Sequence, residues 1–316
     1  MTLAVPTLDL QALGTDPRPL AEACTEWGFF KLTGHGVDPA RRARFMAATR
    51  AFFSAPAGVK QAVLRTADNP WGYFDRELTK NLQDWKEIFD FGIDPVGSDQ
   101  DPSSGQSVSQ WPSGIHDFQP AMLDWFDACY QLSLRLLEHL LPTLGAAPDA
   151  LHGAFAPAHS SFLRLNYYPL CDDPADPAED EPRDGHLGIS HHTDAGALTV
   201  LVQDDVPGLQ VKRDGRWYTV SPDPDAFIVN VGDLVQVWSN NRYRAPLHRV
   251  LANARDVRYS APFFLNPCFD CNVVPLTDEP AAYRAVNWGA YRSGRAAGDY
   301  ADVGQEVQIS DYATDS

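Results

Sequence analysis

Short apolar segments separated by turn residues fill the second half of this chain, and they constrain its fold more than any other feature. The segments are rich in β-branched and aromatic residues and too brief for helices. Turn pairs such as Pro207-Gly208 and Asp214-Gly215 lie between them. Strands at this density predict a barrel or a jelly roll. The predicted strands are 162–168, 197–203, 208–212, 216–220, 226–231, 234–238, 247–252 and 258–266.

The first half of the chain favours helices. Apolar residues recur at three- and four-residue steps, most clearly between Gln119 and Leu144. We predict one catalytic unit over 1–316, because 44% of its residues are apolar and can form one large core. Its expected parts are a short strand at 5–10, helices at 19–29, 41–53 and 119–144, an irregular loop at 94–114, a mainly helical N-terminal region over 1–150, a β core over 160–270 and a helical segment at 280–298.

The charge of the chain limits its partners. The formal net charge is −17, with a pI near 4.8, so we expect no nucleic-acid partner and no anionic membrane. The sequence contains no apolar stretch of membrane-spanning length and no basic, then apolar N-terminal signal. Its five cysteines are an odd and sparse set, which favours a reducing, cytoplasmic location.

Three residues form a candidate metal site. His192 and Asp194 have a spacing that places both side chains on one face of an extended segment. His248 follows in a second apolar stretch and can approach from a neighbouring strand. Two imidazoles and one carboxylate form the facial arrangement of non-haem Fe(II) oxygenases. His191 is a rival ligand, but on a strand it points to the opposite face.

A second polar pair follows His248. Arg258 and Ser260 also share one strand face, within an otherwise apolar segment. A buried arginine needs a partner, and its planar fork suits a carboxylate. The sequence leaves two partners open: an internal acidic residue, or the carboxylate of a ligand held near the metal.

With these motifs in their order, the sequence resembles the Fe(II)/2-oxoglutarate-dependent dioxygenase superfamily, in its isopenicillin N synthase-like branch. The resemblance covers nearly the whole chain. The segments that carry it are 5–10, 24–37, 84–89, 164–169, 192–194, 206–211, 230–233, 239–243, 245–250 and 258–260.

The resemblance implies a double-stranded β-helix with flanking helices and an enzyme that uses Fe(II), 2-oxoglutarate and O2. It implies that His192, Asp194 and His248 bind the iron. It further implies that Arg258 and Ser260 hold the far carboxylate of 2-oxoglutarate, with Tyr168 and Asn166 beside it on a neighbouring strand. The expected reaction is hydroxylation, desaturation or ring formation on a small molecule, with release of succinate and CO2.

Contacts with that small molecule are less well marked. Aromatic side chains suit an apolar or ring-bearing substrate, and arginines suit a carboxylate. The candidates are Trp71, Tyr73, Phe74, Trp111, Tyr243 and Phe264, together with Arg242 and, beside it, Arg76 and Arg244.

Two alternatives stay open at this point. One is a non-haem iron oxidase of the isopenicillin N synthase type, which does not use 2-oxoglutarate. The other is a barrel that binds a metal or a ligand without redox chemistry. The sequence does not identify the substrate or the oligomeric state, and it leaves open whether the acidic insert 172–183 acts as a lid or is a surface loop.

Overall fold

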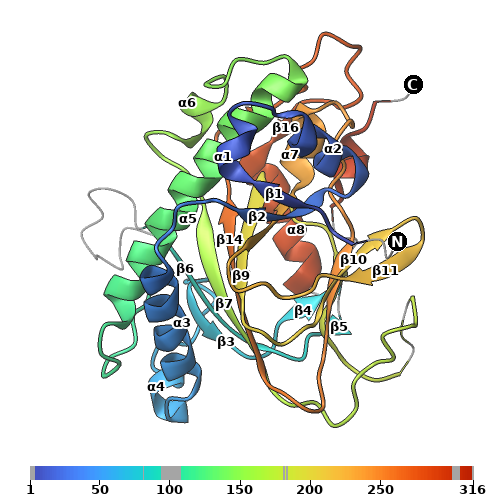
Figure 1. The fold of residues 1–316 in the computed structure, drawn as a ribbon. Helices are drawn as coiled ribbons and strands as arrows, with labels where there is room; N and C mark the ends of the chain where they lie inside the picture. Colours follow the sequence, from blue (N-terminus) through green and yellow to red (C-terminus); the bar gives the residue numbers. More distant parts are fainter. Residues whose placement is uncertain are drawn as a thin grey trace.

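Two β-sheets form the centre of the molecule in the computed structural model, which describes residues 4–80, 82–93, 108–180, 182, 184–300 and 307–314 (Figure 1). The larger sheet has eight strands in the order β1-β2-β12-β9-β14-β7-β6-β3. Their bounds are β1 Thr7–Asp9, β2 Phe29–Thr33, β3 Gly72–Phe74, β6 Glu87–Gly92, β7 Phe162–Tyr168, β9 Leu198–Gln203, β12 Phe227–Val231 and β14 Arg258–Leu265.

The smaller sheet has four strands in the order β11-β10-β13-β8. Its strands pair antiparallel throughout, and His248 lies opposite His192 in the pairing of β13 with β8. This two-sheet jelly roll is the double-stranded β-helix that the sequence predicted. The bounds are β8 Leu187–His192, β10 Leu209–Arg213, β11 Arg216–Thr219 and β13 His248–Leu251.

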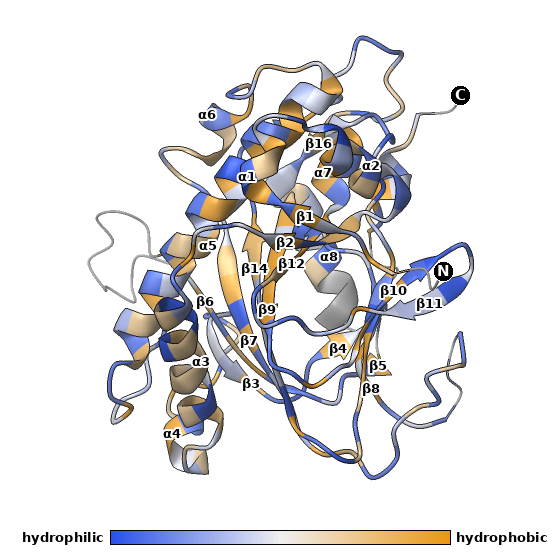
Figure 2. Ribbon diagram, viewed as in Figure 1, coloured by the Kyte–Doolittle hydropathy of each residue, from blue (hydrophilic) through white to orange (hydrophobic). Residues whose placement is uncertain are grey.

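Helices from the N-terminal half cover the outer side of the large sheet (Figure 1). The longest, α5 (Phe118–Leu140), packs against β14 and β9, and α3 (Pro39–Phe53) packs against α5. Figure 2 shows the result, with strongly hydrophobic central strands beneath helices of mixed character. Phe126 of α5 meets Phe263 of β14 edge-on, at 4.9 Å between ring centroids. Burying a ring of this kind stabilises the fold by about 2–3 kcal/mol.

The remaining elements are short, apart from the C-terminal helix α8, which contacts β4 and β16. Within the described residues, no helix is long and apolar enough to cross a membrane. The bounds are α1 Leu10–Leu13, α2 Arg18–Glu26, α4 Ala57–Gln61, β4 Leu78–Thr79, β5 Leu82–Gln83, η2 Leu141–Leu144, α6 His152–Phe155, α7 Asp233–Trp238, β15 Asn272–Val273, β16 Val286–Asn287, α8 Trp288–Tyr300 and η3 Ile309–Tyr312.

The predicted strand at 234–238 is wrong, because this segment forms the short helix α7. All four of its apolar side chains are buried, and periodicity does not distinguish a buried strand from a buried helix over so few residues. The chain turns at Gly232, between β12 and α7. Gly232 lies so close to the loop after β8 that an added Cβ would meet the Gly196 carbonyl oxygen at 2.2 Å.

Other predictions differ in extent. The predicted helical segment at 280–298 is helical only from Trp288, and the predicted loop at 94–114 lies largely outside the described residues. The mainly helical N-terminal region also contributes β1, β2, β3 and β6 to the large sheet.

The two faces of the large sheet differ in chemistry. Phe263 packs outward on α5, so the alternate residues of β14, Arg258, Ser260 and Phe264, point inward. Cross-strand partners share a face, which also places Tyr168 and Asn166 inside, opposite Arg258 and Ser260. Polar side chains therefore line part of the inner side of the large sheet.

Candidate metal centre and cosubstrate pocket

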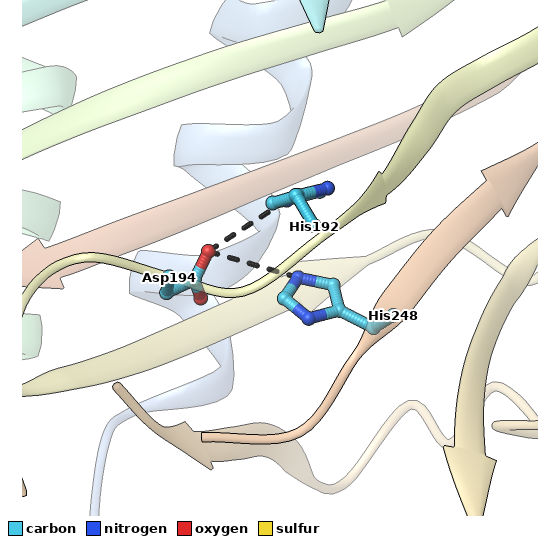
Figure 3. Close-up of side chains that lie close together, drawn as sticks. All are labelled: His192, Asp194 and His248. Atoms are coloured by element: carbon cyan, nitrogen blue, oxygen red, sulfur yellow. Dashed lines mark ion pairs between the residues drawn. The ribbon is translucent and has the colours of Figure 1, made fainter. Parts of the chain in front are cut away.

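His192, Asp194 and His248 converge on one point inside the jelly roll (Figure 3). Asp194 Oδ1 lies 3.7 Å from His192 Nε2 and 3.6 Å from His248 Nε2. His192 ends β8, Asp194 follows two residues later in the connecting loop, and His248 begins the paired strand β13. Among the described residues this is the one cluster of metal-binding groups, and it contains His192 and not His191.

Both imidazoles have their metal-facing nitrogen fixed by a hydrogen bond at the other end of the ring. His192 Nδ1 donates to the Ser190 carbonyl oxygen at 2.8 Å, and His248 Nδ1 donates to the Pro246 carbonyl oxygen at 3.1 Å. A carbonyl oxygen only accepts, so the Nδ1 atoms carry the protons. Each Nε2 then carries a free lone pair. It points to the place where the three side chains converge, as a metal ligand requires.

Asp194 is oriented in the same manner. Thr199 Oγ1 donates to Asp194 Oδ2 at 2.5 Å, and Asn230 Nδ2 donates to the same oxygen at 2.7 Å. Oδ1 alone is left to face the imidazoles. Burial by itself raises the pKa of Asp194, but His248, His192 and these two hydrogen bonds outweigh it, so the pKa lies below its ordinary value. Asp194 is therefore a carboxylate poised to bind through one oxygen.

The electrostatics of His192 agree with a ligand role. The pKa of His192 is lowered to about 3, mainly because the ring is buried and, to a smaller extent, because His248 lies close to it. The imidazole is therefore neutral at ordinary pH. A buried acid holds its strand in place. Asp84 Oδ1 accepts from the Ser190 backbone N–H at 3.1 Å, and Lys86 Nζ lies 3.0 Å from Asp84 Oδ2. Asp84 thus holds the backbone of Ser190, whose carbonyl oxygen in turn fixes the His192 ring.

The chemistry of this donor set fits Fe(II). Two neutral imidazoles and one carboxylate are the ligands of the 2-His-1-carboxylate facial triad, which leaves the opposite side of the ion open. The carboxylate contributes one oxygen because its other oxygen is already occupied by two donors.

Arg258 lies in the same interior, on β14, and is 2% exposed. Its Nη2 donates to Gln203 Oε1 at 2.6 Å, its Nε donates to the Val206 carbonyl oxygen at 3.2 Å, and its guanidinium lies 4.9 Å from the centre of the Tyr168 ring. Within the described part of the chain, no carboxylate lies within ion-pair distance of Arg258. The hydrogen bonds of this buried cation go to neutral groups, and Asp204 acts on it only from beyond ion-pair distance, so the guanidinium is suited to an anionic ligand.

Ser260 and Asn166 form the next row of this pocket. They are cross-strand partners, both almost fully buried, and Asn166 Nδ2 donates to Ser260 Oγ at 3.5 Å. Asn166 Oδ1 has no hydrogen-bond partner. The structure therefore brings all four predicted cosubstrate residues together on two adjacent strands.

The other end of the same strands is aromatic. Phe264 stacks on Phe162 at 4.6 Å between ring centroids, and Trp71 lies 5.9 Å from Phe162. Arg292 of α8 lies 5.1 Å over the Phe162 ring. Phe74, on β3, shares the inner face. Trp71 and Phe264 thus lie at the end of the interior away from Arg258, whereas Phe74 lies in register with Asn166 and Ser260.

The remaining substrate candidates lie elsewhere. Tyr73, Trp111 and Tyr243 pack in or against the main hydrophobic core; Tyr243, for example, exchanges a hydrogen bond with Thr143 at 2.7 Å. Arg242 Nη1 donates to the Thr143 carbonyl oxygen in an exposed position. A substrate contact in the jelly roll therefore does not fit these four, since core packing or a surface contact already accounts for them.

The acidic insert 172–183 packs on the outer face of the small sheet. Arg249, next to His248 on β13, points away from the metal site and is fully buried. Its guanidinium donates to the carbonyl oxygens of Pro177 and Glu179 at 2.8 and 2.7 Å, and its Nε donates to Gln210 Oε1 at 2.9 Å. Residues 181 and 183 of the insert lie outside the described residues. These contacts favour a structural clamp over a lid.

Replacing Arg249 by methionine should release the insert. The change removes the hydrogen bonds to the insert's carbonyl groups, and we expect the free energy of unfolding to fall by about 2–4 kcal/mol. Limited proteolysis should then cut within 174–182 much faster than in the native protein. Arg216→Met, an exposed position on β11, is the control. An insert that stays protected in Arg249→Met would contradict the clamp.

Several site residues escaped the sequence analysis: Thr199, Gln203, Asn230 and Asp84. A signal was present for three of them. Thr199 and Gln203 share one face of an otherwise apolar strand, and Asn230 interrupts another. Polar side chains on a strand buried on both faces need partners, and that requirement points to a site. Asp84 gives no such signal, because its partner Ser190 is distant in the sequence.

Fold and site together define the class of protein: a jelly-roll enzyme with a facial metal triad and a buried arginine pocket. Residues 159–267 match the model of the 2OG-Fe(II) oxygenase superfamily, and residues 5–114 match that of the N-terminal region of a non-haem dioxygenase in morphine synthesis. The chain belongs to the 2OG-Fe(II) oxygenase superfamily. It is a dioxygenase of small molecules that depends on Fe(II) and 2-oxoglutarate.

Its relatives span nearly the whole chain. Jasmonate-induced oxygenase 4 of Arabidopsis thaliana is 33% identical over 304 residues, which cover 92% of this chain and 82% of the relative. Gibberellin 20 oxidase 1 of the same plant is 36% identical, covering 99% and 84%. The crystal structure of JOX2 in complex with 2OG, Fe and JA superimposes with a TM-score of 0.79 at 31% identity, covering 92% of this chain and 84% of that one.

Proposed function

We propose that His192, Asp194 and His248 hold the Fe(II) of this enzyme, and that Arg258 with Ser260 binds the far carboxylate of 2-oxoglutarate. The observation that carries the proposal is that two features face each other between the two sheets. A buried guanidinium that is hydrogen-bonded to neutral groups lies on the inner face of the large sheet, and the three converging ligand atoms come from the small sheet and the loop after β8.

The protein's own groups position the reactants. Arg258 offers two donors in a plane, and Ser260 Oγ can donate beside them, while Tyr168 supports the guanidinium from below. When bound, Fe(II) and 2-oxoglutarate supply O2-dependent oxidation of a substrate C–H bond, with succinate and CO2 released. Fixing the cosubstrate at its far end sets its orientation and lowers the entropic part of the barrier.

We propose a substrate with an apolar body, bound at the aromatic end of the pocket. Phe264, Phe162 and Trp71 form a half-buried wall there, and aromatic faces suit a ring or an aliphatic chain. Arg292, from α8, adds a cation at the same wall. Relatives named for jasmonate and gibberellin support small molecules of this kind, and the negative charge of the chain supports neither nucleic acid nor membrane as a partner.

The test is a screen for compounds that stimulate 2-oxoglutarate turnover. The protein is supplied with Fe(II), O2 and 2-oxoglutarate, and succinate is measured with each small molecule, beginning with jasmonate-like and gibberellin-like acids. With a compound of the correct substrate class, we expect succinate and the oxidised product to form in equal amounts.

The screen also separates the alternatives. Oxygen uptake and product without succinate would favour an oxidase that does not use 2-oxoglutarate. A ligand bound with equal affinity in the presence and absence of the metal, and never oxidised, would favour a non-redox barrel.

A further inference from the structure

We propose that Gln203 is an additional member of the cosubstrate carboxylate site: its side-chain carbonyl orients Arg258, and its amide N–H binds the far carboxylate of 2-oxoglutarate. This inference rests on the proposed role of Arg258. It extends the site from two strands to three.

The register of the large sheet places Gln203 in the pocket. β14 lies between β7 and β9, and Ser260 is the cross-strand partner of both Asn166 and Gln203. Cross-strand partners share a face, so the three form one polar row across three strands. The row adjoins Arg258, the residue two positions before Ser260.

The hydrogen bonds of Gln203 assign its two side-chain atoms. Arginine only donates, so the atom that accepts from Arg258 Nη2 at 2.6 Å is Oε1. The other atom is then the amide nitrogen. Gln203 Nε2 has no hydrogen-bond partner, although the residue is only 4% exposed. Leaving a buried donor unpaired costs about 1–3 kcal/mol, which is a cost that a bound acceptor removes.

A second unpaired atom lies in the same row. Asn166 Oδ1 has no partner either, and Asn166 is 1% exposed. The orphaned donor Gln203 Nε2, next to a cation with no carboxylate within ion-pair distance, is suited to a ligand's carboxylate oxygens, whereas Asn166 Oδ1 is itself an acceptor and is not satisfied by them. A dicarboxylic acid supplies acceptors for Gln203 Nε2 and Arg258.

Two substitutions at Gln203 test this role in different ways. Gln203→Leu removes both the support of Arg258 and the donor, and we expect the Kd for 2-oxoglutarate to rise about 10-fold. Gln203→Glu places a carboxylate against Arg258, where it competes with the ligand, and we expect a rise of about 100-fold. Binding is measured anaerobically by calorimetry on the Fe(II)-loaded protein, so the readout does not require turnover.

The comparison ligand is oxalate, which chelates a metal but has no distant carboxylate. If Gln203 acts on the far carboxylate, the Gln203 variants change the Kd of 2-oxoglutarate and leave that of oxalate within about two-fold. If Gln203 is merely structural, both affinities fall together or neither changes. Either of these results overturns the inference.

The chain offers a matched control in Gln210. It is also a buried glutamine whose Oε1 accepts from an arginine, Arg249, at 2.9 Å, but it lies in the small sheet on the face away from the metal. Gln210→Leu and Gln210→Glu should leave the affinity for 2-oxoglutarate unchanged.

Arg258→Met completes the design. If Arg258→Met leaves the affinity for 2-oxoglutarate unchanged, as the Gln210 controls should, the proposed function of Arg258 fails. If it abolishes binding while both Gln203 variants bind normally, only the present inference fails.

Discussion

His192→Ala should abolish oxidation, lowering the rate of succinate formation by about 1000-fold or more, because the loss of one ligand removes several kcal/mol of metal-dependent stabilisation. The described residues offer no substitute ligand. The cluster contains one atom from each of three residues, and the two that remain are one imidazole and one carboxylate oxygen. Fe(II) binding, measured anaerobically by calorimetry, should fall in parallel with the activity.

The adjacent histidine provides the control for this experiment. His191 stands next to His192 on β8 but lies outside the ligand cluster. His191→Ala should therefore keep Fe(II) affinity within a few-fold of the native value. The reverse result, with Fe(II) binding lost in His191→Ala and kept in His192→Ala, would show that the strand presents the other histidine to the metal.

The metal triad could be predicted because its geometry follows from local rules. Residues two apart on an extended segment share a face, which brings His192 and Asp194 together. The approach of His248 depends on strand pairing, which the sequence suggested only through a second apolar segment. The structure supplies it as a direct cross-strand pair.

The groups that orient these ligands were harder to predict. Asn230 and Asp84 contact the site from strands and loops far away in the sequence, and their roles follow from sheet order rather than from any local pattern. The same reason explains the error at 234–238. Apart from Gln236 that run is apolar, and the helix follows a turn at Gly232 that packs closely against the loop after β8, a contact that the local pattern does not reveal.

The arginine pocket combines both kinds of information. The two-residue spacing in the sequence predicted that Arg258 and Ser260 share a strand face. It left open whether an internal acidic residue pairs with the arginine. The structure gives neutral partners instead, Gln203 and the Val206 carbonyl group. This difference bears on the role of the residue, because Arg258 has no carboxylate within ion-pair distance and the donor beside it, Gln203 Nε2, is unpaired, which together suit an anionic ligand.

Arg258→Met should therefore separate stability from binding. In the ligand-free protein, the removal of a buried charge with no carboxylate in ion-pair distance offsets the loss of its hydrogen bonds to Gln203 and Val206, so we expect the free energy of unfolding to change by no more than about 1–2 kcal/mol. The same change should raise the Kd for 2-oxoglutarate by about 100-fold, because a charge-assisted bidentate contact is lost.

Thermal unfolding of the Fe(II)-loaded protein measures both effects at once. At 100 times its Kd, 2-oxoglutarate stabilises the native protein by about 2.7 kcal/mol; at the same concentration, a variant with a 100-fold weaker Kd gains only about 0.4 kcal/mol. We thus expect 2-oxoglutarate to raise the Tm of the native protein clearly and that of Arg258→Met hardly at all, with similar Tm values in its absence. A ligand-free variant that unfolds far below the native protein would instead assign Arg258 to the fold, and its place in the carboxylate pocket would have to be given up.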